Sequence, residues 1–119
     1  MDIGLLIRWG QILPGREDAA IALFEESVNY YLSLLESGKI TSFEPFLFSM
    51  ADLEQEQGFF LVKGAVPEIF ALMDSDEYKT FMTKANLLVH HLHANMLTVG
   101  DGVAQQLERY AKARQELHI

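Results

Sequence analysis

Cysteine is absent from this chain of 119 residues, which excludes disulfides, thiolate metal sites and cysteine nucleophiles together. Basic residues are also scarce: nine face seventeen acidic ones, for a net charge of −8. No basic stripe is present, so no nucleic-acid partner is expected. The start of the sequence lacks the basic residues and long apolar run of a signal peptide, and no apolar stretch approaches the roughly 18 residues of a membrane span. These absences predict a soluble, cytoplasmic protein with no membrane partner.

The residues that are present are those of an ordinary globular protein, with half of them hydrophobic. At 13.5 kDa the chain has room for one hydrophobic core, so we expect a single domain over residues 1–119. Gly100-Asp101-Gly102 lacks the lysine and length of a phosphate loop, and no nucleophile elbow occurs. We therefore expect no cofactor.

The spacing of apolar residues changes along the sequence, and these changes predict the secondary structure. Residues 3–13 are rich in branched aliphatic residues and stop at Pro14-Gly15, which is typical of a strand. Later runs change between helical and extended spacing. The pattern predicts a helix over 16–37, strands over 42–50 and 59–64 around a hairpin loop at 51–58, a helical region over 67–88 broken near Ser75, a strand over 90–99 and a last helix over 103–117.

This order of elements predicts an α+β fold with a ferredoxin-like βαββαβ arrangement. Its four-stranded antiparallel sheet would carry two helices on one face, with the C-terminal helix as an addition. Pro45 cannot donate to a strand ladder, so its strand should lie at an edge. The second face of the sheet carries phenylalanines and leucines that no predicted element covers except the last helix. We therefore expect a homodimer that pairs these faces.

The helices should bury their apolar stripes. Asp74 and Glu77 have the spacing of a capping box at the start of the helix after the break. The side chains expected in the core are Ile21, Phe24, Val28, Tyr31, Leu32 and Leu35, then Phe70, Met73, Tyr78, Phe81, Met82 and Ala85, and in the last helix Val103, Leu107, Tyr110 and Ala111.

Several segments carry a resemblance to a known group of proteins. They are Ile7-Arg8-Trp9 before Pro14-Gly15, Ser42-Phe43-Glu44-Pro45-Phe46, the run from Gly58 to Gly64, and Ser75-Asp76-Glu77-Tyr78. The chain resembles the dimeric α/β-barrel group, and within it small uncharacterised bacterial members. The resemblance implies a barrel formed by two ferredoxin-like subunits. The group includes cofactor-free monooxygenases of aromatic substrates and isomerases, besides members with no known activity.

Strand alternation sorts candidate site residues by face. Ile3, Leu5 and Ile7 should meet the helices, which directs Arg8 to the other side. If the polar members of each strand share a cavity with aromatic neighbours, a small-molecule site results. The expected ligand-binding residues are Arg8, Glu44, Phe46, Phe48, Lys63 and Asn95. A one-residue bulge would exchange the faces.

His91 and His93 flank Leu92, and two histidines at i and i+2 on a strand lie about 7 Å apart on one face. They could share a metal, but they lack the ligand count of a zinc site, so no metal is expected. Either one could act as a general base, or the pair could simply pack at the strand end. Arg8 and Glu44 could form an ion pair, or Arg8 could hold a substrate oxyanion.

Two functions follow from these residues. The first is a non-enzymatic protein that binds a small apolar or aromatic molecule in a cavity between sheet and helices, gated by the loop over residues 54–58. The alternative is a cofactor-independent monooxygenase or isomerase of an aromatic or enolisable substrate. In that case His91 or His93 would remove a proton, and Arg8 or Asn95 would stabilise the oxyanion.

Overall fold

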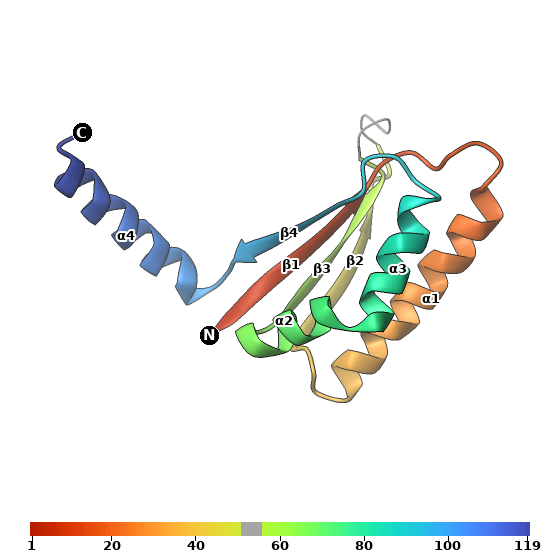
Figure 1. Ribbon diagram of the computed structural model, residues 1–119, viewed down its shortest axis with the longest axis horizontal. Helices are drawn as coiled ribbons and strands as arrows, with labels where there is room; N and C mark the ends of the chain where they lie inside the picture. Colours follow the sequence, from red (N-terminus) through yellow and green to blue (C-terminus); the bar gives the residue numbers. More distant parts are fainter. Residues whose placement is uncertain (51–55) are drawn as a thin grey trace.

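The computed structural model describes residues 1–50 and 56–119 (Figure 1). Residues 51–55, most of the expected hairpin loop, lie outside the described residues. The elements in chain order are β1 (Asp2–Trp9), α1 (Glu17–Glu36), β2 (Ser42–Leu47), β3 (Gly58–Ala65), α2 (Val66–Asp74), α3 (Asp76–Asn86), β4 (His93–Thr98) and α4 (Asp101–Leu117).

The four strands form one antiparallel sheet in the order β2-β3-β1-β4. Helices α1, α2 and α3 lie together on one side of it (Figure 1). This confirms the α+β, ferredoxin-like prediction. β2 is an edge strand, so Pro45 leaves no ladder bond unmade on its free side, as expected.

The core lies between the sheet and the helices. Leu5 and Ile7 of β1 are buried, and so are their partners Val62 and Phe60 on β3. Directly paired residues in an antiparallel sheet point to the same side, so this face of the sheet is the helix-facing one. The predicted alternation in β1 is therefore correct, and Arg8 points to the opposite, open face.

The predicted apolar side of α1 is only partly buried: Tyr31 is buried as expected, and Phe24 and Val28 pack against the core. The buried residues of the helix are Leu23, Ser27 and Tyr31, one turn apart. Ser27 tolerates burial because its hydroxyl donates to the Leu23 carbonyl at 2.7 Å. Of the predicted core residues, Ile21, Leu32 and Leu35 are exposed instead.

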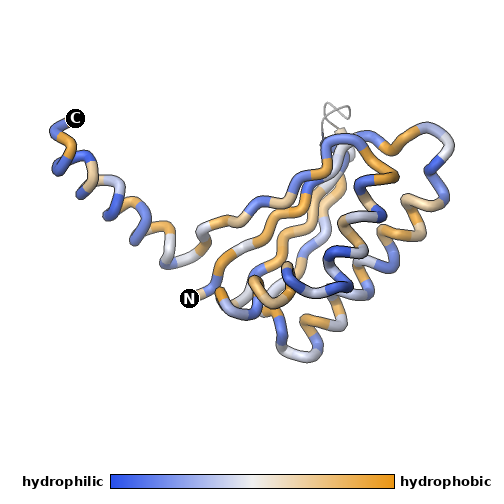
Figure 2. Tube along the Cα trace, in the orientation of Figure 1, coloured by the Kyte–Doolittle hydropathy of each residue, from blue (hydrophilic) through white to orange (hydrophobic). Residues whose placement is uncertain are grey.

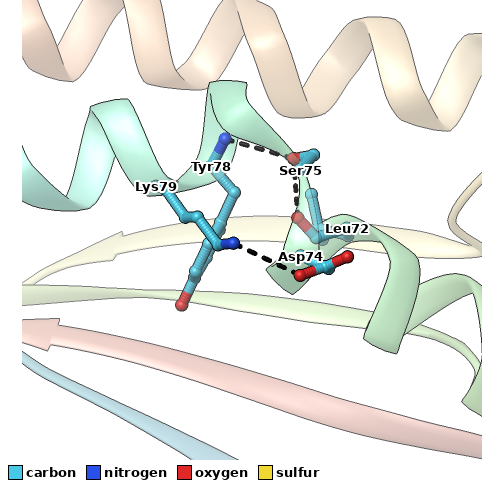
Figure 3. A network of polar contacts seen from close by, with 5 residues as sticks. All are labelled: Leu72, Asp74, Ser75, Tyr78 and Lys79. Atoms are coloured by element: carbon cyan, nitrogen blue, oxygen red, sulfur yellow. Dashed lines mark hydrogen bonds and ion pairs between the residues drawn. The ribbon is translucent and has the colours of Figure 1, made fainter.

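The helical region breaks at Ser75, as predicted, but its cap differs. Ser75 has an extended backbone, and its hydroxyl accepts a hydrogen bond from the Tyr78 amide at 3.2 Å (Figure 3). Asp74 instead makes an ion pair with Lys79 at 3.2 Å. The capping-box prediction is therefore wrong, because serine occupies the N-cap position itself.

Burial on α2 also differs from the prediction, while α3 buries Tyr78 as expected. Phe70 is 51% exposed, whereas Ile69 and Leu72 are buried. Pro67 lies in the first turn of α2 and fixes where that helix starts. The start of α2 directly after β3 determines which side faces the sheet, and the apolar period alone did not reveal this.

Three of the predicted strands, the first, the second and the last in the chain, extend further than the real ones. β2 ends at Leu47 rather than at residue 50. β1 ends at Trp9, and beyond it the chain pairs only through an isolated bridge between Ile12 and Val89 among the described residues. β4 begins at His93 rather than at residue 90.

α4 extends away from the rest of the molecule, beyond the end of β4 (Figure 1). Every residue of α4 except Gly102 is exposed, so the predicted burial of Val103, Leu107, Tyr110 and Ala111 is wrong for the single chain. The radius of gyration is 16.7 Å, against about 13.5 Å for a compact chain of this length. Across the described part of the chain, no helix combines the length and apolar character needed to cross a membrane.

Candidate functional site

A cavity of about 570 Å³ lies between the sheet and the helices α1 and α3. The strands contribute Ile7 and Trp9 from β1 and Phe60 from β3. The wall from the helices includes Phe24 and Tyr31 of α1 and Phe81 and Met82 of α3, with Leu88, Val89 and Leu92 from the segment that follows. Leu47, Phe48 and Gln57 lie around one end, where β2 ends and β3 begins.

Aromatic rings in mutual contact form the wall on the sheet side. The Phe60 ring lies 5.0 Å from that of Trp9 and 5.5 Å from that of Phe24, between centroids. Trp9 and Phe24 meet edge to face at 6.0 Å. Such arrangements favour the ring quadrupoles and hold each side chain in one orientation. The cavity therefore has one rigid aromatic wall.

Tyr31 and Ser27 are the buried polar residues of the lining, and Tyr31 has 2% of its surface exposed. Burial, followed by the neighbouring Tyr78 and Tyr30, raises the pKa of its hydroxyl well above the usual range. Burial also raises the pKa of Tyr78. Among residues 1–50 and 56–119, no hydrogen bond joins the Tyr31 hydroxyl to another residue. At neutral pH this hydroxyl is an uncharged donor at the cavity wall.

These raised pKa values predict alkaline sensitivity. A tyrosine whose pKa is higher in the folded state stabilises the fold below its unfolded pKa of about 10, and this contribution is lost as pH rises further. We expect the free energy of unfolding to fall above pH 10, by about 1.4 kcal/mol per pH unit from Tyr31. Tyr31→Phe should flatten this slope in urea titrations at several pH values. Tyr110→Phe, at a tyrosine exposed in the single chain, is the control, with all three proteins at low concentration. Equal slopes in the three proteins would contradict the prediction.

The residues predicted to bind a ligand lie on the opposite, open face of the sheet. Register places Arg8 in one row with Phe59, Phe46 and His93. The next row holds Leu6, Leu61, Glu44 and Asn95, and the third includes Lys63. The register places Arg8, Glu44, Phe46, Lys63 and Asn95 on one face, as expected from strand alternation, but this face does not line the cavity between sheet and helices. Their role in ligand binding stays a prediction. Phe48 alone of the predicted set lines the cavity.

Arg8 is paired, but not with Glu44. Its Nη1 donates to Oε1 of Glu56 at 2.9 Å, and its Nη2 donates to Oδ1 of Asn95 at 3.3 Å. Glu44 lies opposite Leu61, in the neighbouring row, so the expected pair between Arg8 and Glu44 is wrong. The ion pair that forms is partly exposed, and such pairs contribute little stability.

His91 and His93 do not lie together on a strand face. His91 precedes β4 in a bend, with a positive φ of 55°, while His93 is the first residue of β4 and pairs with Arg8. The chain has turned between them, which invalidates the i, i+2 geometry. Within the described ranges, no three His, Asp or Glu side chains come close enough to hold a metal ion.

Sequence reasoning missed the residues that make the cavity. Trp9, Phe24, Phe60 and Tyr31 have the hydrophobic spacing of core residues, and space left between core side chains has no pattern in the sequence. Ala20 and Ala85 give the only hint, since small side chains on helix faces that meet a sheet leave room.

No family model matches the chain, and no curated sequence matches it. Solved structures match it by shape. A dimeric protein of unknown function with a ferredoxin-like fold from Bacteroides fragilis is 9% identical, with a TM-score of 0.58 over 80% of this chain and 93% of its own. Candidate antibiotic biosynthesis monooxygenases from Deinococcus radiodurans and Chloroflexus aurantiacus are 12% and 14% identical, with TM-scores of 0.57 and 0.53. They cover 85% and 84% of this chain, and 94% and 95% of their own. This likeness establishes the ferredoxin-like fold.

Proposed function

We propose that this protein binds a small, uncharged apolar or aromatic molecule in the cavity between its sheet and its helices. The observation that carries the proposal is the cavity itself, with a volume of about 570 Å³ and an aromatic wall. Small-molecule sites usually occupy roughly 300–1,000 Å³ and combine apolar walls with few polar groups. We place this activity in the cytoplasm, as the sequence suggested.

The polar groups of the lining suit an uncharged ligand. The Ser27 hydroxyl donates to the Leu23 carbonyl, and the Tyr31 hydroxyl, like that of any tyrosine, is uncharged at neutral pH. Glu25, the charged residue of the lining, is exposed at the surface. A charged ligand inside would lose its hydration without a buried counter-ion, which is costly. Tyr31 is the group that would orient a ligand carrying one hydrogen-bond acceptor.

A substitution that fills the cavity with a large side chain tests the proposal. Ala20→Trp places an indole where Ala20 lines the space, and Ala22→Trp places one on an exposed part of the same helix. Binding of N-phenyl-1-naphthylamine, an uncharged aromatic probe, is followed by its own fluorescence. We expect Ala20→Trp to weaken binding by about 100-fold, because overpacking costs roughly 3 kcal/mol. Ala22→Trp should bind as the wild type does. Equal affinities in the two variants would refute the cavity as the site.

The enzymatic alternative rests on a different place in the fold. Arg8, Asn95 and His93 lie together on the open face, where an oxyanion hole and a base could be assembled. Two of the similar structures are candidate monooxygenases. Oxygen uptake with phenolic substrates discriminates between the proposals. Turnover that His93→Ala abolishes, and that Ala20→Trp leaves intact, would favour the alternative.

We also propose that the chain forms a homodimer through the open face. Phe46 of β2 is 40% exposed there, and its ring stacks on Phe59 at 4.7 Å, with Leu6 and Leu61 in the adjoining row. An uncovered apolar sheet face of this kind usually marks an interface. The similar protein from Bacteroides fragilis is dimeric.

A further inference from the structure

α4 carries an apolar stripe that nothing in the single chain covers. Val103, Leu107, Tyr110 and Leu117 follow one another at intervals of four, three and seven residues, so they share one side of the helix. Their exposed fractions range from 45% to 67%. Figure 2 shows hydrophobic segments recurring along α4 between hydrophilic ones. Most of the stability of helices in proteins comes from packing of an amphipathic face, so the uncovered stripe of α4 favours a packing partner.

A second unpartnered stripe with the same spacing lies on α1. Ile21, Leu32 and Leu35 are exposed, and Val28 is half-buried between them. The complete series on α1 is residues 21, 25, 28, 32 and 35, and on α4 it is residues 103, 107, 110, 114 and 117. Both follow the alternating four-and-three spacing with which two helices pack along a common seam. Each series is apolar apart from one charged residue, Glu25 on α1 and Arg114 on α4.

One charged residue on each stripe sets the orientation of the pairing. α1 carries five acidic residues and no basic one, whereas α4 carries three basic and three acidic residues and has no net charge. The complementary charges are therefore those of Glu25 and Arg114 within the two stripes. In an antiparallel pairing of the two stripes, Glu25 and Arg114 fall in the same or adjacent layers, within reach of each other. A parallel pairing separates them by two layers and leaves both without a counter-ion.

α4 cannot reach the α1 stripe of its own chain. Only Val99 and Gly100 connect β4 to α4, and the two helices lie at opposite ends of the molecule (Figure 1). The chain's own α1 is therefore out of reach. We propose that α4 packs antiparallel on the α1 stripe of a second copy of this chain, whose α4 packs on the first in return.

The contact area is sufficient for such an exchange. A helix of 17 residues is about 25 Å long and roughly 10 Å across, so covering a third of its side removes about 260 Å² from solvent. Two reciprocal contacts, counted on both partners, remove about 1,000 Å², the lower bound for a specific interface. α1 and the open face lie on opposite sides of the sheet, so the two contacts do not compete for one surface.

The exchange would also complete the cavity described above. Ile21 and Glu25 belong both to the α1 stripe and to the cavity lining. A partner helix seated on that stripe lies at the rim of the cavity and narrows its opening. The docking itself does not depend on what the cavity binds.

Cross-linking between two different full-length variants tests the proposal. The chain has no cysteine, so a Leu32→Cys chain mixed with a Leu107→Cys chain presents one thiol on each stripe. A short bis-maleimide should then give a covalent heterodimer. Lys112→Cys is the matched control, because Lys112 lies about two and a half turns from Val103, on the far side of α4. Equal yields with Leu107→Cys and Lys112→Cys, or no product with either, would overturn the proposal.

Charge reversal tests the orientation in the same mixture. Adding Glu25→Arg to the Leu32→Cys chain, or Arg114→Glu to the Leu107→Cys chain, should lower the yield about two- to fivefold, the range for a partly exposed pair. Making both changes should restore the yield, because the opposite charges then meet again between molecules. Failure of the combined change to restore the yield would exclude the antiparallel pairing.

Discussion

Phe60→Ala is expected to lower the free energy of unfolding by about 3–5 kcal/mol, the range for removing a buried aromatic ring from a core. Phe60 is 5% exposed, and its ring contacts those of Trp9, Phe24, Tyr31 and Phe43 at centroid distances of 5.0 to 5.7 Å. Removal of the ring enlarges the cavity and leaves four aromatic rings without a shared neighbour. Urea unfolding followed by far-UV circular dichroism measures the loss.

Phe59→Ala is the matched control, one residue earlier in β3 and on the other face of the sheet. Its ring contacts Phe46 and Phe48 only, among the aromatic side chains of the described residues. We expect a loss of about 1 kcal/mol at low protein concentration, growing as the concentration rises if the open face pairs with a second copy. The loss in Phe60→Ala should not depend on concentration. If Phe60→Ala proves too unstable to purify, Phe60→Leu should show the same contrast at about 1.5 kcal/mol. Equal losses at positions 59 and 60 would mean that the strand faces are assigned wrongly.

Gly58→Ala is expected to destabilise the protein by about 2–3 kcal/mol, the cost of overpacking a tight site. A Cβ atom at Gly58 would lie 2.6 Å from the Phe46 carbonyl oxygen and 2.7 Å from Cζ2 of Trp9. Neither atom is the end of a flexible chain, so the β2–β3 pairing or the indole must move. Because Trp9 lines the cavity, we also expect weaker binding of N-phenyl-1-naphthylamine.

Gly64→Ala provides the comparison within the same strand and on the same face. Its Cβ would meet the Cδ1 atom of Ile69 at 3.2 Å, which is the end of a side chain that can rotate. We expect a change within about 1 kcal/mol and unchanged probe binding, since the loss of glycine freedom in the unfolded chain offsets mild crowding. A Gly58→Ala protein as stable as Gly64→Ala would show that the sheet accommodates a methyl group beside Trp9.

The fold could be predicted from the sequence because apolar residues are spaced differently in its strands and in its helices. Alternation in β1 placed Leu5 and Ile7 against the helices, and Pro45 marked an edge strand. The same reasoning predicted the burial of the last helix wrongly. An amphipathic pattern shows that a face will be buried, but not against which surface, and the α4 stripe is uncovered in the single chain.

The candidate site was predicted less well, for two physical reasons. The prediction chose Arg8 and Asn95 because polar residues that share a strand face can form a binding site. The cavity is instead lined by apolar side chains, whose spacing in the sequence is that of ordinary core residues. Local backbone geometry also separated the two histidines that were predicted to share a strand face. The positive φ of His91 turns the chain before β4, and no spacing rule reveals such a turn between two histidines.

Trp9 is the only tryptophan of the chain, and its indole lies in the cavity wall between Phe24 and Phe60. Light at the red edge of aromatic absorption therefore excites one known position, with no background from a second indole. Its emission reports the polarity of the cavity directly, since water entering the space shifts it to longer wavelength and an apolar occupant shifts it back. The protein thus carries its own optical sensor for whatever molecule it takes up.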